Sequence, residues 1–355
     1  MAFNKNNRAL ARFISAIALA LNLLPFAMNS ALADDAITLG CKESRTKTAL
    51  DFSSLGINLS SAVPVGTVVA EGVISLDFIC ALDNPVQYYN GAAAEVYIKR
   101  AAIADGALGY GLTLYTDIGG SGMTSEAGSY PTGDIITTWA ITSGGTVGTY
   151  TDVSVSIPFK IVRTSSSMEK STTIGTVGTI SKAFSAGSLV SGSDVFFNIT
   201  NINNSITIKD ETCSVAGDKN QTVTLGEYTA SKSSGLGSGI GQTSAMKSFN
   251  IQLNCEALLS GKFDVMMQFD GDSASGLSDV GVLALNSTST ARGVGVQILN
   301  GSEHPISLAT PFSVASYPLS TASVTVPLYA RYYQTADTIT PGSANAVAQY
   351  TISYQ

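Results

Sequence analysis

Charged residues and histidine are scarce in this sequence. Asp, Glu, Lys and Arg make up 13% of the 355 residues, against roughly 25% in average globular proteins. Basic tracts are missing and the net charge is −7, which excludes nucleic-acid binding because that needs clustered Lys and Arg. His304 is the only histidine, so a Ser–His or Cys–His catalytic pair is disfavoured. We expect neither an enzyme nor a cofactor.

Helical periodicity is missing as well. No segment repeats apolar residues every 3.6 positions between capping residues for a dozen residues. Gly, Ser, Thr, Val and Ile take the place of the charged residues, and these residues form strands and turns with little helical tendency. The composition therefore predicts an all-β protein.

Long apolar runs are confined to the N-terminus. Three basic residues precede the apolar stretch Phe13–Met28, and small residues lead up to Ala33. This order is typical of a signal peptide cleaved after Ala33. A membrane anchor is the alternative, but the run is short for a bilayer and Pro25 interrupts its end. Removal of residues 1–33 changes the net charge to −10, and we expect no membrane span after processing.

Four cysteines are present, with no CxxC motif and no Cys/His cluster that would suggest a metal site. In an exported chain they indicate two disulfides, and three pairings are formally possible. Each half of the chain holds one similarly spaced pair. Cys41 and Cys80 lie 39 residues apart, and Cys213 and Cys255 lie 42 apart.

The paired spacing suggests one architectural plan used twice. Short alternating segments separated by Gly- and Ser-rich stretches predict a β-sandwich in each half. In the first half a strand pair is expected in 66–81, with single strands at 93–100, 111–116, 135–142 and 152–163. In the second half strands are expected at 221–225, 249–255, 263–269, 293–299, 323–332 and 346–354. The resulting domains are 34–207 and 213–355, joined by a linker at 208–212.

The last predicted strand alternates strictly to the end of the chain. Tyr350, Ile352 and Tyr354 share one face, and polar residues fill most of the other. No later segment of the chain can pair with its outer edge, and an uncovered apolar edge promotes aggregation. The cover would come from another polypeptide by strand addition; an ordinary terminal strand in a complete sheet is the alternative.

The second half resembles a chaperone–usher pilin domain of the type 1 fimbrial kind. The resemblance rests on Phe249-Asn-Ile-Gln-Leu-Asn-Cys255, Ala291-Arg-Gly-Val-Gly-Val-Gln-Ile-Leu299, Leu328-Tyr-Ala-Arg-Tyr-Tyr333 and Pro341-Gly342. It also places Cys213 and Cys255 in the family's disulfide positions, Gly342 fourteenth from the end and Tyr354 next to last.

This resemblance implies an immunoglobulin-like sandwich that lacks its final strand. A periplasmic chaperone would cap it, an outer-membrane usher would pass it on, and a neighbouring pilin subunit would then donate the missing strand. The residues expected at this chaperone and donor-strand interface are Gly342, Tyr350, Ile352, Tyr354 and Gln355.

The first half resembles, over fewer residues, the lectin domain of two-domain tip adhesins. The shared features are Gly40-Cys41, Val65-Gly66, Ala186-Gly187-Ser188-Leu189 and the run Cys80-Ala-Leu-Asp83-Asn-Pro85. That run resembles the C-x-x-D-x-P motif of the mannose-binding type 1 adhesin, in which the Asp binds the sugar, although Leu82 replaces the family's Asn.

Sugar sites combine hydrogen-bonding side chains with an aromatic or apolar wall. The loop after Cys80 offers both kinds, and the freed N-terminus adds a further candidate. The predicted ligand-binding residues are Asp83, Asn84, Gln87, Tyr88, Tyr89 and Asp34. A plain Asx-Pro turn with core-capping tyrosines is the alternative, and Trp139 is interpreted as a core residue.

Residues 34–40 precede Cys41 and are too few to begin a strand and also reach into a neighbour. A chain that receives a strand but donates none ends a polymer. We therefore expect an adhesin exported through the periplasm to the cell surface, located at the fimbrial tip and binding a host-surface glycan or glycoprotein. The alternative is a structural minor pilin or adaptor without sugar-binding activity.

Overall fold

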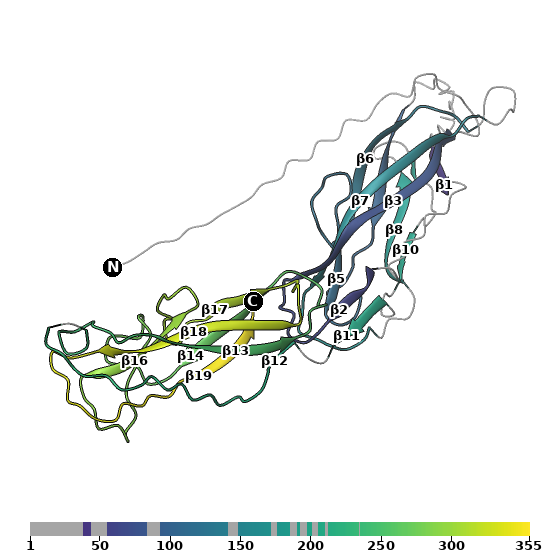
Figure 1. The fold of residues 1–355 in the computed structure, drawn as a ribbon. Coiled ribbons are helices and arrows are strands. Elements are labelled where there is room, and N and C mark those ends of the chain that lie inside the picture. The colour runs from purple at the N-terminus through teal and green to yellow at the C-terminus, as the bar shows by residue number, and fades with distance from the viewer. Residues whose placement is uncertain are drawn as a thin grey trace, which may run out of the picture. The chain divides into compact units, whose positions relative to one another are not determined.

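The computed structural model describes residues 38–43, 55–83, 93–140, 148–171, 176–184, 190–191, 197–200, 205–209, 212–233 and 235–355. Every regular element in these ranges is a strand (Figure 1), which confirms the predicted all-β class. No helix in these ranges is both long and apolar enough to cross a membrane. The predicted signal peptide, 1–33, lies outside the described residues.

Two sheets form the first immunoglobulin-like sandwich. One has the strand order β5–β7–β3–β1–β9 and the other β10–β8–β4–β6. Alternate residues of the long strands are buried between the sheets because successive side chains of a strand point to opposite faces. The bounds are β1 (Thr38–Glu43), β3 (Val68–Asp83), β4 (Ala94–Arg100), β5 (Leu112–Thr116), β6 (Gly128–Ile136), β7 (Thr151–Arg163), β8 (Thr176–Phe184), β9 (Val190–Ser191) and β10 (Phe197–Thr200).

Two predictions for this half are wrong in detail. The expected strand pair in 66–81 is the single strand β3, which pairs along most of its length with β7. The strand expected at 135–142 overlaps β6 only at Ile135 and Ile136. Gly133 and Asp134 lie inside β6, although such residues are more common in turns.

Both predicted sandwiches contain their own disulfide. Cys41 bonds to Cys80 with a Cα–Cα distance of 4.1 Å, and Cys213 bonds to Cys255 with a Cα–Cα distance of 3.9 Å. Each bond joins two directly paired residues of neighbouring strands, β1 to β3 and β12 (Cys213–Val215) to β13 (Lys247–Cys255). Of the three possible disulfide pairings, the structure therefore has the one in which each half of the chain contains one bond.

A buried arginine holds the loop between β5 and β6. The Arg100 side chain is 0% exposed. Its guanidinium donates hydrogen bonds to the Thr116 carbonyl and hydroxyl, to the carbonyls of Thr124 and Glu126, and to the Tyr130 hydroxyl. Burial is the main reason that the pKa of Arg100 lies below its usual value. The charge is stabilised by carbonyl dipoles, and the loop is fixed at its base.

A short parallel pair connects the first sandwich to the second half of the chain. β2 (Ile57–Leu59) pairs with β11 (Ile206–Ile208), so Ile208, the first residue of the predicted linker, ends a strand. The backbone N–H of Ser260 donates to the Asn58 carbonyl at 2.9 Å, and the Asn58 N–H donates to the Ser260 hydroxyl at 3.0 Å.

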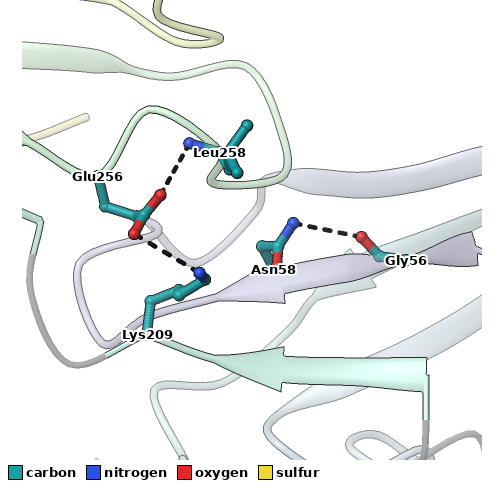
Figure 2. Close-up of polar contacts among 5 residues, drawn as sticks. All are labelled: Gly56, Asn58, Lys209, Glu256 and Leu258. Atoms are coloured by element: carbon teal, nitrogen blue, oxygen red, sulfur yellow. Dashed lines mark hydrogen bonds and ion pairs between the residues drawn. The ribbon is translucent and has the colours of Figure 1, made fainter. Parts of the chain in front are cut away.

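An ion pair lies next to these contacts. Figure 2 shows Lys209 Nζ 3.6 Å from Glu256 Oε2, while Glu256 Oε1 accepts a hydrogen bond from the Leu258 N–H. In the same view the Asn58 side chain donates to the Gly56 carbonyl. Both partners of the ion pair are partly exposed, so its contribution to stability is small.

The second sandwich has a five-stranded sheet, β12–β13–β18–β16–β15, and a three-stranded sheet, β17–β14–β19. The two sheets enclose core residues that include Leu253, Val265, Met267 and Leu328. The remaining bounds are β14 (Asp264–Asp270), β15 (Val282–Leu283), β16 (Val294–Asn300), β17 (Phe312–Ser316), β18 (Ser323–Gln334) and β19 (Gln349–Tyr354).

Pro327 lies in a strand with neighbours on both sides. β18 pairs with β13 and β16, and Pro327 is opposite Asn250 on β13. The ladder with β16 ends at the pair Asn300–Leu328, one residue before Pro327 is reached. Pro327 has no N–H to donate, and it stands where β18 is locally an edge.

One buried amide orders a glycine- and serine-rich segment. Gln334 is 0% exposed. Its side-chain oxygen accepts hydrogen bonds from the N–H groups of Gly237 and Gly239. Its side-chain nitrogen donates to the carbonyls of Ala336 and Asp337, and its backbone pairs with Gly241 and Gln242.

Candidate functional site

The outer edge of the last strand has no neighbour among the described residues. β19 pairs on one side with β14 and forms the edge of its sheet. Tyr350, Ile352 and Tyr354 face the core but are only half-buried. Their partners on β14 lie on the same face and are almost completely buried, with Val265 and Met267 at 0% and Phe269 at 3%. The difference follows from the missing neighbour of β19.

A second unpaired edge runs near β19. In the described chain the backbone of Gln221–Ala230 makes no hydrogen bond to other protein groups, and Leu225 is nevertheless 7% exposed. The sequence predicts a strand at 221–225; the structure has a segment without a ladder there. Only Val223 and Leu225 of this segment are shielded from solvent, and residues 226–230 are exposed.

Tyrosine hydroxyls connect β19 to the segment that leads into this edge. The Tyr354 hydroxyl accepts a hydrogen bond from the Cys213 N–H at 3.0 Å. The Tyr350 hydroxyl donates to the Lys219 carbonyl at 3.4 Å. Both backbone groups belong to residues before 221–230, so the hydroxyls link β19 to the segment that precedes the second edge. Burial, followed by the charge of Asp218, raises the pKa of Tyr350.

The other predicted interface residues are placed differently. Gln355 exchanges two backbone hydrogen bonds with Asp264, which extends the β19–β14 ladder to the last residue. Gly342 is exposed, but a Cβ there would lie 2.6 Å from the Ala291 nitrogen. Gly342 is therefore required for close backbone packing within this chain.

At the other candidate site only Asp83 is described. It is the last residue of β3, is half-buried and pairs with Thr38 of β1. The remaining predicted ligand-binding residues, Asn84, Gln87, Tyr88, Tyr89 and Asp34, lie outside the described residues.

A further contact on β1 involves residues that the sequence analysis did not select. The Lys42 ammonium lies 4.0 Å from the centre of the Tyr150 ring. Lys42 pairs with Ile79 on β3, four positions before Asp83. Lys42 and Tyr150 meet only because β1 and β7 flank β3, and no local sequence pattern predicts that. Trp139 bridges to Leu82 and packs against the core, as interpreted from the sequence.

One comparison with known proteins is confined to the second half of the chain. Residues 201–355 match the family model described as fimbrial protein. The type-1 fimbrial protein A chain of Escherichia coli is 35% identical over 178 residues, which cover 49% of this chain and 89% of that protein. A fimbria adhesin protein of Klebsiella pneumoniae is 30% identical over 155 residues, which cover 42% of this chain and 47% of that protein.

The match thus spans about half the length of the Klebsiella adhesin. Among solved structures, a tip adhesin from Pseudomonas aeruginosa covers 89% of this chain and 94% of its own, with 17% identity and a TM-score of 0.35. The identity and coverage of the Escherichia coli relative show that this chain belongs to the fimbrial protein family, whose members are structural and adhesive subunits of surface fimbriae.

Proposed function

We propose that the chain is a fimbrial tip adhesin. Its second sandwich accepts a strand from a neighbouring subunit, and its first sandwich binds a receptor on the host surface. The observation that carries the first part is the pair of unpaired edges, β19 and 221–230, beside half-buried core residues. Strand addition supplies main-chain hydrogen bonds to both edges and covers the apolar side chains.

A periplasmic chaperone and an outer-membrane usher are the partners that this assembly route requires. The donor is a neighbouring pilin subunit. The segment around Cys41 does not act as a donor in turn, because β1 is paired with β3 and β9 and is fixed by the Cys41–Cys80 disulfide. This favours a position at the end of the fibre.

Hydrogen–deuterium exchange on the full chain tests strand acceptance. The probe is a synthetic peptide with the alternating sequence of a fimbrial subunit's N-terminal arm. Exchange is expected to slow in 221–230 and at the N–H groups of β19 that point away from β14. The exchange of β17 should stay unchanged and serves as an internal control. If a chain with native disulfides shows no slower exchange in either segment, strand acceptance is wrong.

Receptor binding is proposed for the end of the first sandwich that carries Asp83, with a glycan or glycoprotein as ligand. A glycan array with the peptide-complemented chain identifies the ligand. Asp83→Ala is expected to abolish binding. Asp77→Ala is the matched control, since Asp77 lies on the same face of β3 and accepts a hydrogen bond from the Ser154 hydroxyl. Equal loss in both variants, or in neither, would remove Asp83 from the site.

The alternative is a minor pilin or adaptor without sugar-binding activity. It shares the strand-accepting second sandwich, so the exchange experiment does not separate the two. An array without any bound glycan, together with normal incorporation into fimbriae, would favour the adaptor.

A further inference from the structure

The chain leaves the first sandwich through a short ladder. Among the described strands β11 pairs only with β2, and the two run parallel side by side (Figure 1). The Lys209 N–H extends this ladder by donating to the Leu59 carbonyl at 2.9 Å. The chain continues from Lys209 into its second half, so a pull on the linker reaches the ladder first at the bond between Lys209 and Leu59.

A buried arginine holds the chain just beyond Leu59. The Arg163 side chain is 1% exposed, and its Nη1 donates hydrogen bonds to the carbonyls of Ser60 and Val63. Its Nε and Nη2 bond to the segment 165–168. Burial of apolar side chains in β2 also holds this strand, and the guanidinium adds directional bonds that are strengthened by its charge.

The same arginine belongs to the larger sheet of the sandwich. Arg163 is the last residue of β7, the strand between β5 and β3. Its backbone pairs with β5 on one side, and on the other it accepts from the Gly66 N–H and donates to the Thr67 carbonyl. The β3–β7 ladder runs from this end to Cys80, which precedes Asp83 on β3. Arg163 and Asp83 therefore lie at opposite ends of that ladder.

We propose that Arg163 anchors the exit of the first sandwich. It passes tension from β2 and β11 into the β5–β7–β3 sheet and sets the force at which the exit detaches. The inference rests on the proposed function, under which the chain carries tension between a receptor near Asp83 and the fibre beyond the linker. Without the guanidinium, the carbonyls of Ser60 and Val63 lose their bonds to the sheet, while the β3–β7 ladder keeps its own.

Single-molecule pulling on the full chain with both disulfides intact tests this anchor, because forced unfolding reports the unfolding rate. One handle is placed before Thr38, which pairs with Asp83, and the Cys41–Cys80 disulfide passes its pull into β3. In the linker geometry the second handle is at exposed Lys219, so β11 and β2 are pulled. In the loop geometry it is at exposed Asp105, between β4 and β5, and neither strand is pulled directly.

Arg163→Met is expected to shorten the lifetime of the first sandwich under constant force. In the linker geometry the lifetime should fall at least about tenfold, because bonds to a charged donor that break as the exit detaches are already lost. In the loop geometry it should change less than about threefold, because the sandwich yields elsewhere while these contacts are still intact.

Two further variants accompany this substitution. Arg163→Lys keeps the charge but offers fewer donors in a different geometry, so its lifetime in the linker geometry should lie between those of the wild type and Arg163→Met. It also keeps the test usable if Arg163→Met does not fold. Lys160→Met is the matched control, since it removes a cation from a partly exposed position of the same strand, and it should change neither lifetime.

The two geometries separate an anchor from a residue that merely stabilises the sandwich. Equal shortening in both geometries would overturn the proposal, and so would an unchanged lifetime in the linker geometry. Neither lifetime involves a receptor or a donated strand. A failed anchor therefore leaves the proposed adhesin function to its exchange and array experiments, and failure of those experiments leaves the measured lifetimes as they are.

Discussion

The hydroxyl of Tyr354, the second-last residue, accepts a hydrogen bond from the backbone N–H of Cys213, the first residue of β12. The first and last strands of the second sandwich are therefore connected through one side chain and not through a ladder.

Removal of the buried guanidinium should destabilise the first sandwich. Arg100→Met is expected to lower the free energy of unfolding by about 3–5 kcal/mol, because several buried carbonyls lose their donor. Urea unfolding measures the change. Lys99→Met, at the neighbouring exposed position, should change it by less than about 0.5 kcal/mol. Similar effects of both substitutions would contradict the role of Arg100 as a clamp.

Alkaline pH should destabilise the second sandwich through Tyr317. Burial, with smaller contributions from Tyr354 and Glu256, raises the pKa of Tyr317 from 10.0 to about 12. The folded chain thus keeps a proton that the unfolded chain loses. This group leaves stability constant below pH 10 and lowers it by roughly 1.4 kcal/mol per pH unit between pH 10 and 12.

Tyr317→Phe should remove that part of the pH dependence. At pH 7 the substitution is expected to be neutral or slightly stabilising, because the buried hydroxyl has no hydrogen-bond partner among the described residues. Chemical denaturation between pH 7 and 12 tests both statements, with the exposed Tyr228→Phe as control. A large loss of stability at pH 7 would show that the hydroxyl has a partner.

A methyl group at position 342 should be poorly tolerated. Gly342→Ala places a Cβ 2.6 Å from the Ala291 nitrogen and 2.7 Å from the Thr290 carbonyl carbon. The expected loss is about 1–3 kcal/mol, since backbone atoms must shift. Thermal unfolding measures it, and the exposed Val347→Ala provides the reference. If Gly342→Ala keeps full stability but loses peptide binding, Gly342 acts at the interface instead.

The disulfides should contribute comparably to their own sandwiches. Each closes a loop of about 40 residues, which in the chain-entropy model stabilises the folded state by about 4 kcal/mol. The pair Cys41→Ser and Cys80→Ser is expected to destabilise the first sandwich and leave the exchange rates of β13, β14 and β18 unchanged. Hydrogen exchange resolved by segment checks this, and uniform loss of protection would contradict it.

The long strands could be predicted from sequence because their alternation is local. β7, β13 and β14 each repeat apolar residues at every second position, and this pattern survives whatever the strands pair with. The predicted strand at 221–225 has the same alternation but no ladder, since hydrogen bonding depends on a partner that the pattern does not encode.

In the candidate sites, too, features that depend on local alternation could be predicted and long-range contacts could not. Tyr350, Ile352 and Tyr354 were predicted from alternation, and the structure places them on one half-buried face. The contacts of Tyr354 with Cys213 and of Lys42 with Tyr150 join residues more than 100 positions apart. Such contacts follow from the strand order and register of the folded chain. Alternation within one strand does not reveal either of them.

The amide of Gln334 has a consequence for survival outside the cell. Residues 235–242 have the composition of a flexible linker, which extracellular proteases cut readily. Here the backbone of the segment is hydrogen-bonded to the side chain and to the backbone of Gln334, the last residue of β18. A protease must wait for these hydrogen bonds to open before it can bind the segment, so the loop withstands digestion for as long as β18 stays folded.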